Sequence, residues 1–112
     1  NPAGKVELQA GNAGTTVCST ATSPSAATWI HITATWNNTT KLGKIFINGV
    51  QDASGTSAGT VIAATAAVWV LGAYGAVPSL FMNGRLDDMV LWDRILSDAE
   101  ILLNAGRTTP LV

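Results

Sequence analysis

Residues 29–50 read WIHITATWNNTTKLGKIFINGV, and this stretch decides the fold class. Polar and apolar side chains alternate from Trp29 to Trp36, which is typical of a strand whose successive side chains point to opposite faces. The run 37–43 then supplies a turn, and a second strand is predicted over Lys44–Asn48. The pair Asn48-Gly49 favours a tight type I′ turn, because both of its central positions need a positive φ. The stretch therefore predicts two successive antiparallel pairings.

Shorter runs on either side extend this pattern along the chain. Further strands are predicted over Lys5–Ala10, Thr15–Ser19, Ala67–Ala73 and Gly84–Trp92. The last of these carries apolar residues on both faces, which predicts a central strand that is covered on both sides. Together the runs predict an all-β fold, an antiparallel two-sheet jelly-roll sandwich.

One helix is predicted, at the end of the chain. Ser97-Asp98-Ala99-Glu100 fits a capping box, in which the Ser97 hydroxyl and the Glu100 carboxylate each accept from the other residue's backbone amide. Gly106 suits the left-handed position just past a helix end. We therefore expect one short C-terminal helix that closes the β-domain.

Composition bounds the organisation and the partners. The chain has 112 residues, of which 12% are charged, and a formal net charge of −1, so a single domain over 1–112 is predicted. The six Lys and Arg residues are scattered, which argues against a nucleic-acid partner. Cys18 is the single cysteine and cannot form an internal disulfide. Residues 53–84 carry no charge, but Gly72, Gly75 and Pro78 favour β-structure over a membrane span.

Side chains suited to catalysis are scarce. His31 is the single histidine and lies within a predicted strand, which favours a structural role over general acid–base work. Residues 55–59 match the Gly-x-Ser-x-Gly nucleophile motif by letter, but they lie in a predicted loop of small residues. Asp87 and Asp88 are neighbours on a predicted strand and point to opposite faces, so they cannot form the facing carboxylate pair of a glycosidase. No enzymatic activity is predicted.

Four blocks of the sequence, in order, resemble those of a known superfamily. They are Trp29–Trp36, Ile45–Val50, Val70–Ala73 and Phe81–Ile101. The last block, FMNGRLDDMVLWDRILSDAEI, is the most specific, and it is similar to the pattern Phe-x-Gly-x-Ile-Asp-Asp/Glu-Val-x-hydrophobic-aromatic-Asn/Asp-Arg-x-Leu-Ser-x-x-Glu-Ile. The chain thus resembles the laminin-G-like, concanavalin-A-like lectin jelly rolls, which include the pentraxins.

This resemblance implies a module that binds glycans or proteins without catalysis. In many members the Asp that matches Asp87 helps to hold a structural calcium ion, so calcium is the cofactor that the resemblance implies, with Asp87 as its ligand. The stretch that matches the acidic pentraxin calcium loop, residues 73–79, carries no carboxylate. The run Gly4–Leu8 resembles a strand from the middle of the domain, so we expect the family's first strands to be missing from the sequence.

The first hypothesis for function is a lectin-like module that recognises a carbohydrate or a cell surface. Sugar sites combine an aromatic platform with a few fixed polar groups. The candidates in predicted loops are Tyr74 as the platform and Asn37, Asn38, Asp52 and Asn83 as polar partners. The expected partner is a glycan or a surface protein, and the expected location is extracellular or surface-exposed.

Two alternatives stay open. A mean hydropathy of +0.31 and the uncharged stretch favour a structural or assembly module of a surface or virion protein, which would bury apolar surface in a homo-oligomer or in a larger parent protein. The same jelly roll also hosts glucanases, but fold alone does not confer that activity.

Overall fold

The computed structural model describes residues 4–10, 16–58, 70–73 and 81–107. Five strands and one helix follow in chain order: β1 Glu7–Gln9, β2 Thr16–Ser19, β3 Ile32–Trp36, β4 Leu42–Ile47, β5 Val50–Thr56 and α1 Asp98–Ala105. Contacts divide the chain into two units, of which the first comprises residues 1–62 and 92–109 and holds all six elements. The second unit comprises residues 63–91 and 110–112.

The predicted hairpins form the larger sheet of the first unit. Its strand order is β3-β4-β5, and both pairings are antiparallel. Between β4 and β5, Asn48 has φ 50° and Gly49 has φ 83°, which confirms the predicted turn. Strand β3 begins at Ile32 and not at the predicted Trp29, whose side chain is 66% exposed. The Asn48 side-chain oxygen accepts from the His31 amide at 2.9 Å, so the turn also holds the entry to β3.

A second sheet, the antiparallel pair β1-β2, packs against one face of the larger sheet. Gly43 and Gly55 lie opposite each other in the β4-β5 ladder on that face. A Cβ atom at Gly43 would lie 2.5 Å from the side chain of Leu8, and one at Gly55 would collide with the backbone oxygen of Val17. The two sheets can approach this closely because neither position carries a side chain.

Cys18 lies buried between the two sheets. Its Sγ atom is 3.9 Å from the Gly43 carbonyl oxygen, and burial raises the pKa of the thiol. A raised thiol pKa keeps the reactive thiolate scarce at neutral pH. Cys18 therefore acts as a small apolar side chain.

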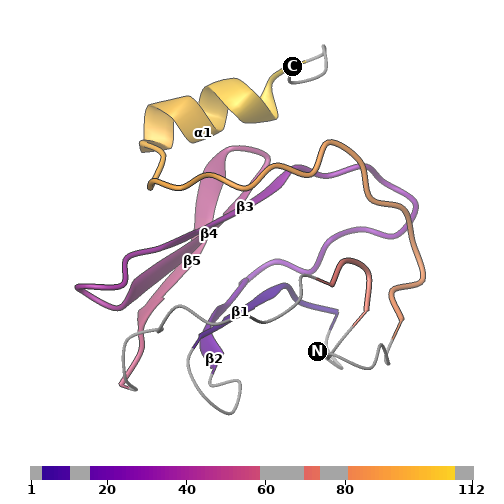
Figure 1. Ribbon diagram of the computed structural model, residues 1–112. Helices are drawn as coiled ribbons and strands as arrows, with labels where there is room; N and C mark the ends of the chain where they lie inside the picture. Colours follow the sequence, from indigo (N-terminus) through magenta and orange to yellow (C-terminus); the bar gives the residue numbers. More distant parts are fainter. Residues whose placement is uncertain (1–3, 11–15, 59–69, 74–80, 108–112) are drawn as a thin grey trace. The chain divides into compact units, whose positions relative to one another are not determined.

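Helix α1 packs on the opposite face of the larger sheet, so the sheet lies between the helix and β1-β2 (Figure 1). Phe46, Leu96 and Ile101 form the buried apolar cluster on this side. The capping box at Ser97 is present as predicted. The prediction for Gly106 is wrong: its φ is −86°, because its amide still donates to the Leu102 carbonyl in a helix-type bond.

The predicted strand over 84–92 does not form, and every residue in it is exposed. A strand depends on ladder hydrogen bonds to a neighbour, and no segment of the described chain pairs with this one. Asp88 also has φ 50°, which interrupts an extended backbone. Residues 70–73 of the predicted strand 67–73 are likewise not strand, and 67–69 lie outside the described residues.

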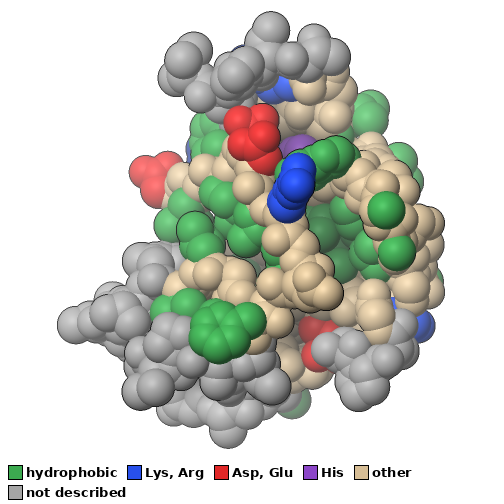
Figure 2. All heavy atoms as spheres, turned by 90° about the vertical axis from the view of Figure 1, so that its right-hand side faces the viewer, with side chains coloured by type: hydrophobic (Ala, Val, Ile, Leu, Met, Phe, Trp, Pro, Cys, Tyr) green, Lys and Arg blue, Asp and Glu red, His purple; other side chains and the backbone are tan. Residues whose placement is uncertain are grey.

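Apolar side chains therefore reach the surface. Figure 2 shows several of them on the face turned to the viewer. Among the described residues of the second unit, the exposed large apolar ones are Leu71, Phe81, Met82, Leu86, Met89, Val90 and Leu91. No helix in the described ranges is long and apolar enough to span a membrane.

The Gly55→Val substitution tests the close packing of the two sheets. The new side chain would meet the Val17 backbone, so we expect a loss of about 1–3 kcal/mol in the free energy of unfolding, measured by urea denaturation. Gly106→Ala is the matched control, since a Cβ there lies 3.8 Å from its nearest atoms, and its stability should stay within about 0.5 kcal/mol of the parent. Equal stability of both variants would contradict the packing.

Candidate functional site

A hollow of about 190 Å³ lies between the larger sheet and the segment that leads into α1. Its lining combines polar and apolar side chains: Thr35, Asn37, Leu42, Lys44, Ile95, Leu96 and Asp98. All seven belong to the first unit. Pockets for drug-sized ligands usually measure about 300–1,000 Å³, so this hollow suits a small group such as one ring of a larger ligand.

The sheet wall of the hollow follows from strand register. Thr35 and Lys44 are opposite residues in the β3-β4 ladder, so their side chains leave the sheet on the same face. Leu42 precedes Lys44 by two residues and shares this face. The alternation of β4 also places buried Phe46 there, under α1. The face of the sheet that packs against the helix thus also lines the hollow.

Asn37 closes one end of the hollow from the turn between β3 and β4. Its side-chain oxygen accepts from the amides of Thr39 and Thr40, at 2.9 and 3.0 Å. Its backbone carbonyl accepts from the Lys41 amide at 2.7 Å. The turn therefore fixes the Asn37 side chain through its oxygen, and the NH₂ group is the part that can donate to a ligand.

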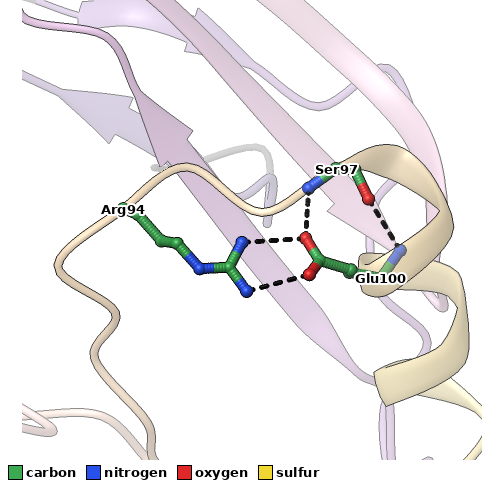
Figure 3. Close-up of polar contacts among 3 residues, drawn as sticks. All are labelled: Arg94, Ser97 and Glu100. Carbon is green, nitrogen blue, oxygen red and sulfur yellow. Dashed lines mark hydrogen bonds and ion pairs between the residues drawn. The ribbon is translucent and has the colours of Figure 1, made fainter.

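The other wall is held by a clasp formed by Arg94, Ser97 and Glu100 (Figure 3). The Arg94 guanidinium donates to both carboxylate oxygens of Glu100, at 3.0 and 2.8 Å. Glu100 also accepts from the Ser97 amide at 2.8 Å, and the Glu100 amide donates to the Ser97 hydroxyl at 3.2 Å. The clasp spans Ile95 and Leu96 and leads directly into Asp98, so it sets the course of the wall.

Opposite charges face each other across the hollow. Lys44 Nζ lies 3.9 Å from Asp98 Oδ1, and the two side chains are 31% and 70% exposed, respectively. The lysine is a donor and the aspartate an acceptor. With the Thr35 hydroxyl and the Asn37 amide, the hollow can exchange hydrogen bonds with a ligand rich in hydroxyl groups.

Three of the five candidate ligand-binding residues, Asn37, Asn38 and Asp52, are described in the first unit, and of these three Asn37 lines the hollow. Asn38 is exposed, and its side-chain oxygen accepts from the Trp36 indole at 3.2 Å. Asn83 is exposed in the second unit. Tyr74 lies outside the described residues. A binding site shared by all five residues stays a prediction.

Asp52 has a structural role. The register of β4-β5 skips it, so it is the extra residue of a β-bulge. Its carboxylate accepts from the Thr22 hydroxyl at 2.8 Å and from the amides of Thr22 and Ala21 at 3.2 and 2.6 Å. These bonds, led by the one from the Thr22 hydroxyl, lower the pKa of Asp52. Asp52 ties the loop after β2 to the sheet.

Sequence reasoning missed Thr35, Lys44 and Asp98 as site residues. The first two are ordinary members of alternating strands, and the third is part of the helix start. The sequence signal that could have identified Thr35 is the polar face of β3, which Thr35 shares with Thr33. What brings Asp98 to that face is the packing of α1, which alternation alone does not specify.

Asp87, the predicted calcium ligand, is exposed, and its Oδ1 atom accepts from the Asp88 amide at 2.9 Å. Calcium takes six to eight oxygen ligands. The described residues hold no cluster of three or more His, Cys, Asp or Glu side chains that could hold a metal ion. The described groups around Asp87 therefore do not fit a calcium site by themselves.

Comparison with known proteins supports the fold. A family model described as the concanavalin A-like lectin/glucanases superfamily matches residues 1–102. A solved structure of an S-layer domain-containing protein from Clostridium thermocellum is similar, with 22% sequence identity and a TM-score of 0.61. The match covers 88% of this chain and 48% of that chain, so this chain spans about half of its length. No curated protein matches.

The clasp predicts a pH signature. The hydrogen bonds from Arg94, followed by the one from the Ser97 amide, lower the pKa of Glu100 to about 2 from its ordinary 4.5. Because the folded-state pKa is the lower one, this stabilisation is present above pH 4.5 and is lost as the pH falls through about 2. Carboxyl NMR titration should find the Glu100 midpoint near 2, and Arg94→Gln should raise it. A midpoint near 4.5 in the parent chain would contradict the clasp.

Proposed function

Because the chain belongs to the concanavalin A-like lectin/glucanase superfamily, we propose that it is a non-catalytic carbohydrate-binding module that acts through the hollow beside α1. The observation that carries the proposal is the pairing of Lys44 and Asp98 across a small hollow that also offers a hydroxyl and an amide. These are fixed polar groups on a scaffold of strands and a capped helix, as small-ligand sites require.

The chemistry of a sugar ring suits this lining. A sugar presents hydroxyl groups at its edge and C–H groups on its faces, and the hollow offers the polar groups above together with the apolar side chains of Leu42, Ile95 and Leu96. Burial of C–H surface contributes about 25 cal/mol per Å². The polar groups would set the orientation of the ring, and the apolar side chains would add contact area.

A binding role is favoured over hydrolysis by the carboxylates. Glycosidases use two carboxylates that face each other about 5–9.5 Å apart. Asp98 is the single carboxylate in the lining of the hollow. His31 lies outside that lining, half-buried beside β3, with its Nδ1 atom 3.5 Å from the Thr33 hydroxyl.

The proposed location is extracellular or on a cell surface. The similar solved structure carries an S-layer domain description, and a carbohydrate-binding role fits a surface that displays glycans. Calcium binding at Asp87 is a separate proposal, which rests on the family resemblance and which a chelator tests.

A second candidate function is assembly on a surface layer. The observation in its favour is the exposed apolar run of the second unit, in which Phe81 and Leu91 are 73% and 72% exposed. Such a run is unusual on a monomeric soluble domain and is typical of an interaction surface.

A glycan array with and without EDTA tests the first proposal. The hollow offers protein side chains as its polar groups, so we expect binding that persists in EDTA and that Lys44→Met weakens at least tenfold. The matched control is Lys5→Met, which removes a lysine beside β1, on the far side of the larger sheet, and should bind as the parent does. Loss of binding in EDTA, matched by loss in Asp87→Asn, would instead support calcium at Asp87, and no binding to any glycan would contradict the proposed function.

Size-exclusion chromatography with light scattering tests the assembly candidate. If the exposed run is buried between copies, the parent chain should form an oligomer and Phe81→Ser with Leu91→Ser should shift it towards monomer. A parent chain that stays monomeric at high micromolar concentration would contradict assembly between copies of this chain.

A further inference from the structure

We propose that the hollow selects an uncharged sugar ring and holds it by two neighbouring hydroxyl groups, one at Lys44 and one at Asp98. This inference rests on the proposed carbohydrate-binding function and deepens it, because it names the class of sugar. The argument begins with the spacing of the two charged groups.

Lys44 and Asp98 are close enough to attract each other but too far apart for a direct hydrogen bond. Their 3.9 Å separation exceeds the about 2.7–2.9 Å of a charge-assisted N–H···O bond. The ammonium group keeps its donors and the carboxylate keeps its acceptor sites. A ligand group placed between them can therefore bond to both at no cost in broken protein hydrogen bonds.

A pair of hydroxyl groups matches this arrangement better than a charged group does. A hydroxyl both donates and accepts, so one can accept from the Lys44 ammonium while its neighbour donates to the Asp98 carboxylate. A carboxylate or an amino group on the ligand would be attracted by one member of the 3.9 Å pair and repelled by the other, so the two effects largely cancel. A charged group also loses more hydration than a hydroxyl does when it enters the hollow. The charge pair therefore disfavours both acidic and basic sugars.

Two further groups extend the contact along one edge of the ring. Thr35 lies beside Lys44 in the β3-β4 ladder, and Asn37 offers its NH₂ group from the adjoining turn. Thr35 adds a hydroxyl that can donate or accept, and Asn37 adds a donor. Each can reach a third hydroxyl or a ring oxygen, so recognition needs no charge on the ligand.

NMR titration of the full chain with three methyl hexosides tests the inference: a neutral hexoside with a vicinal diol, a hexuronide and a 2-amino-2-deoxyhexoside. We expect the neutral hexoside to bind at least tenfold more tightly than either charged one. Methylation of its vicinal hydroxyls should remove the advantage. A hexuronide that binds as tightly as the neutral sugar would overturn the inference.

Variants separate the roles of the two charges. Asp98→Asn and Lys44→Met should each weaken the neutral hexoside about tenfold, the equivalent of about 1.4 kcal/mol. Asp93→Asn is the control for Asp98→Asn, because Asp93 is exposed and lies outside the hollow, and it should bind as the parent does. Thr35→Val provides a second test that leaves the helix start intact, and it should weaken the same sugar.

The outcomes distinguish this inference from the function on which it rests. One outcome would overturn the neutral-diol inference and leave carbohydrate binding in place. In that outcome the hollow prefers the hexuronide, Lys44→Met loses the binding and Asp98→Asn improves it. Binding that none of the hollow variants changes would overturn both the inference and the proposed site.

Discussion

The burial of β4 on both of its faces is the constraint on which the other features depend. Ile45 and Phe46 are neighbours, point to opposite faces and are 0% and 1% exposed, so each needs its own covering layer. The β1-β2 sheet covers the first face, where the Gly43-Gly55 pair lets the backbones come close. Helix α1 covers the second face through Leu96 and Ile101.

The hollow results from the way in which helix α1 packs on the larger sheet. Phe46 and Lys44 leave β4 on the same side, so the helix that covers Phe46 also brings Asp98 to Lys44. The Arg94–Ser97–Glu100 clasp defines where the helix begins and so limits the freedom of the wall between Ile95 and Asp98. The charge pair is thus held by two elements that are fixed for reasons of packing and capping.

Features set by local rules could be predicted from the sequence. The alternation within residues 32–47, the Asn48-Gly49 turn and the capping box at Ser97 each depend on a few adjacent residues, and the structure confirms all three. The family resemblance and the two-sheet fold are confirmed as well.

Features that depend on distant partners could not be predicted in the same way. Residues 84–92 carry a strand pattern but form no strand, because the ladder also needs a paired segment. Asp52 has the composition of a ligand-binding residue but is occupied by the loop after β2, 30 residues away in sequence. Thr35, Lys44 and Asp98 meet only because α1 returns to the sheet, which no local pattern specifies.

The most direct test of the central claim is the map of backbone amide shift changes when a neutral glycan selected on an array is added to the isotope-labelled chain. Our account predicts that the changes concentrate on residues 35–37, 42–44 and 95–98 and are lost in Lys44→Met. Changes that fall instead on residues 81–91, with the hollow unperturbed, would contradict it.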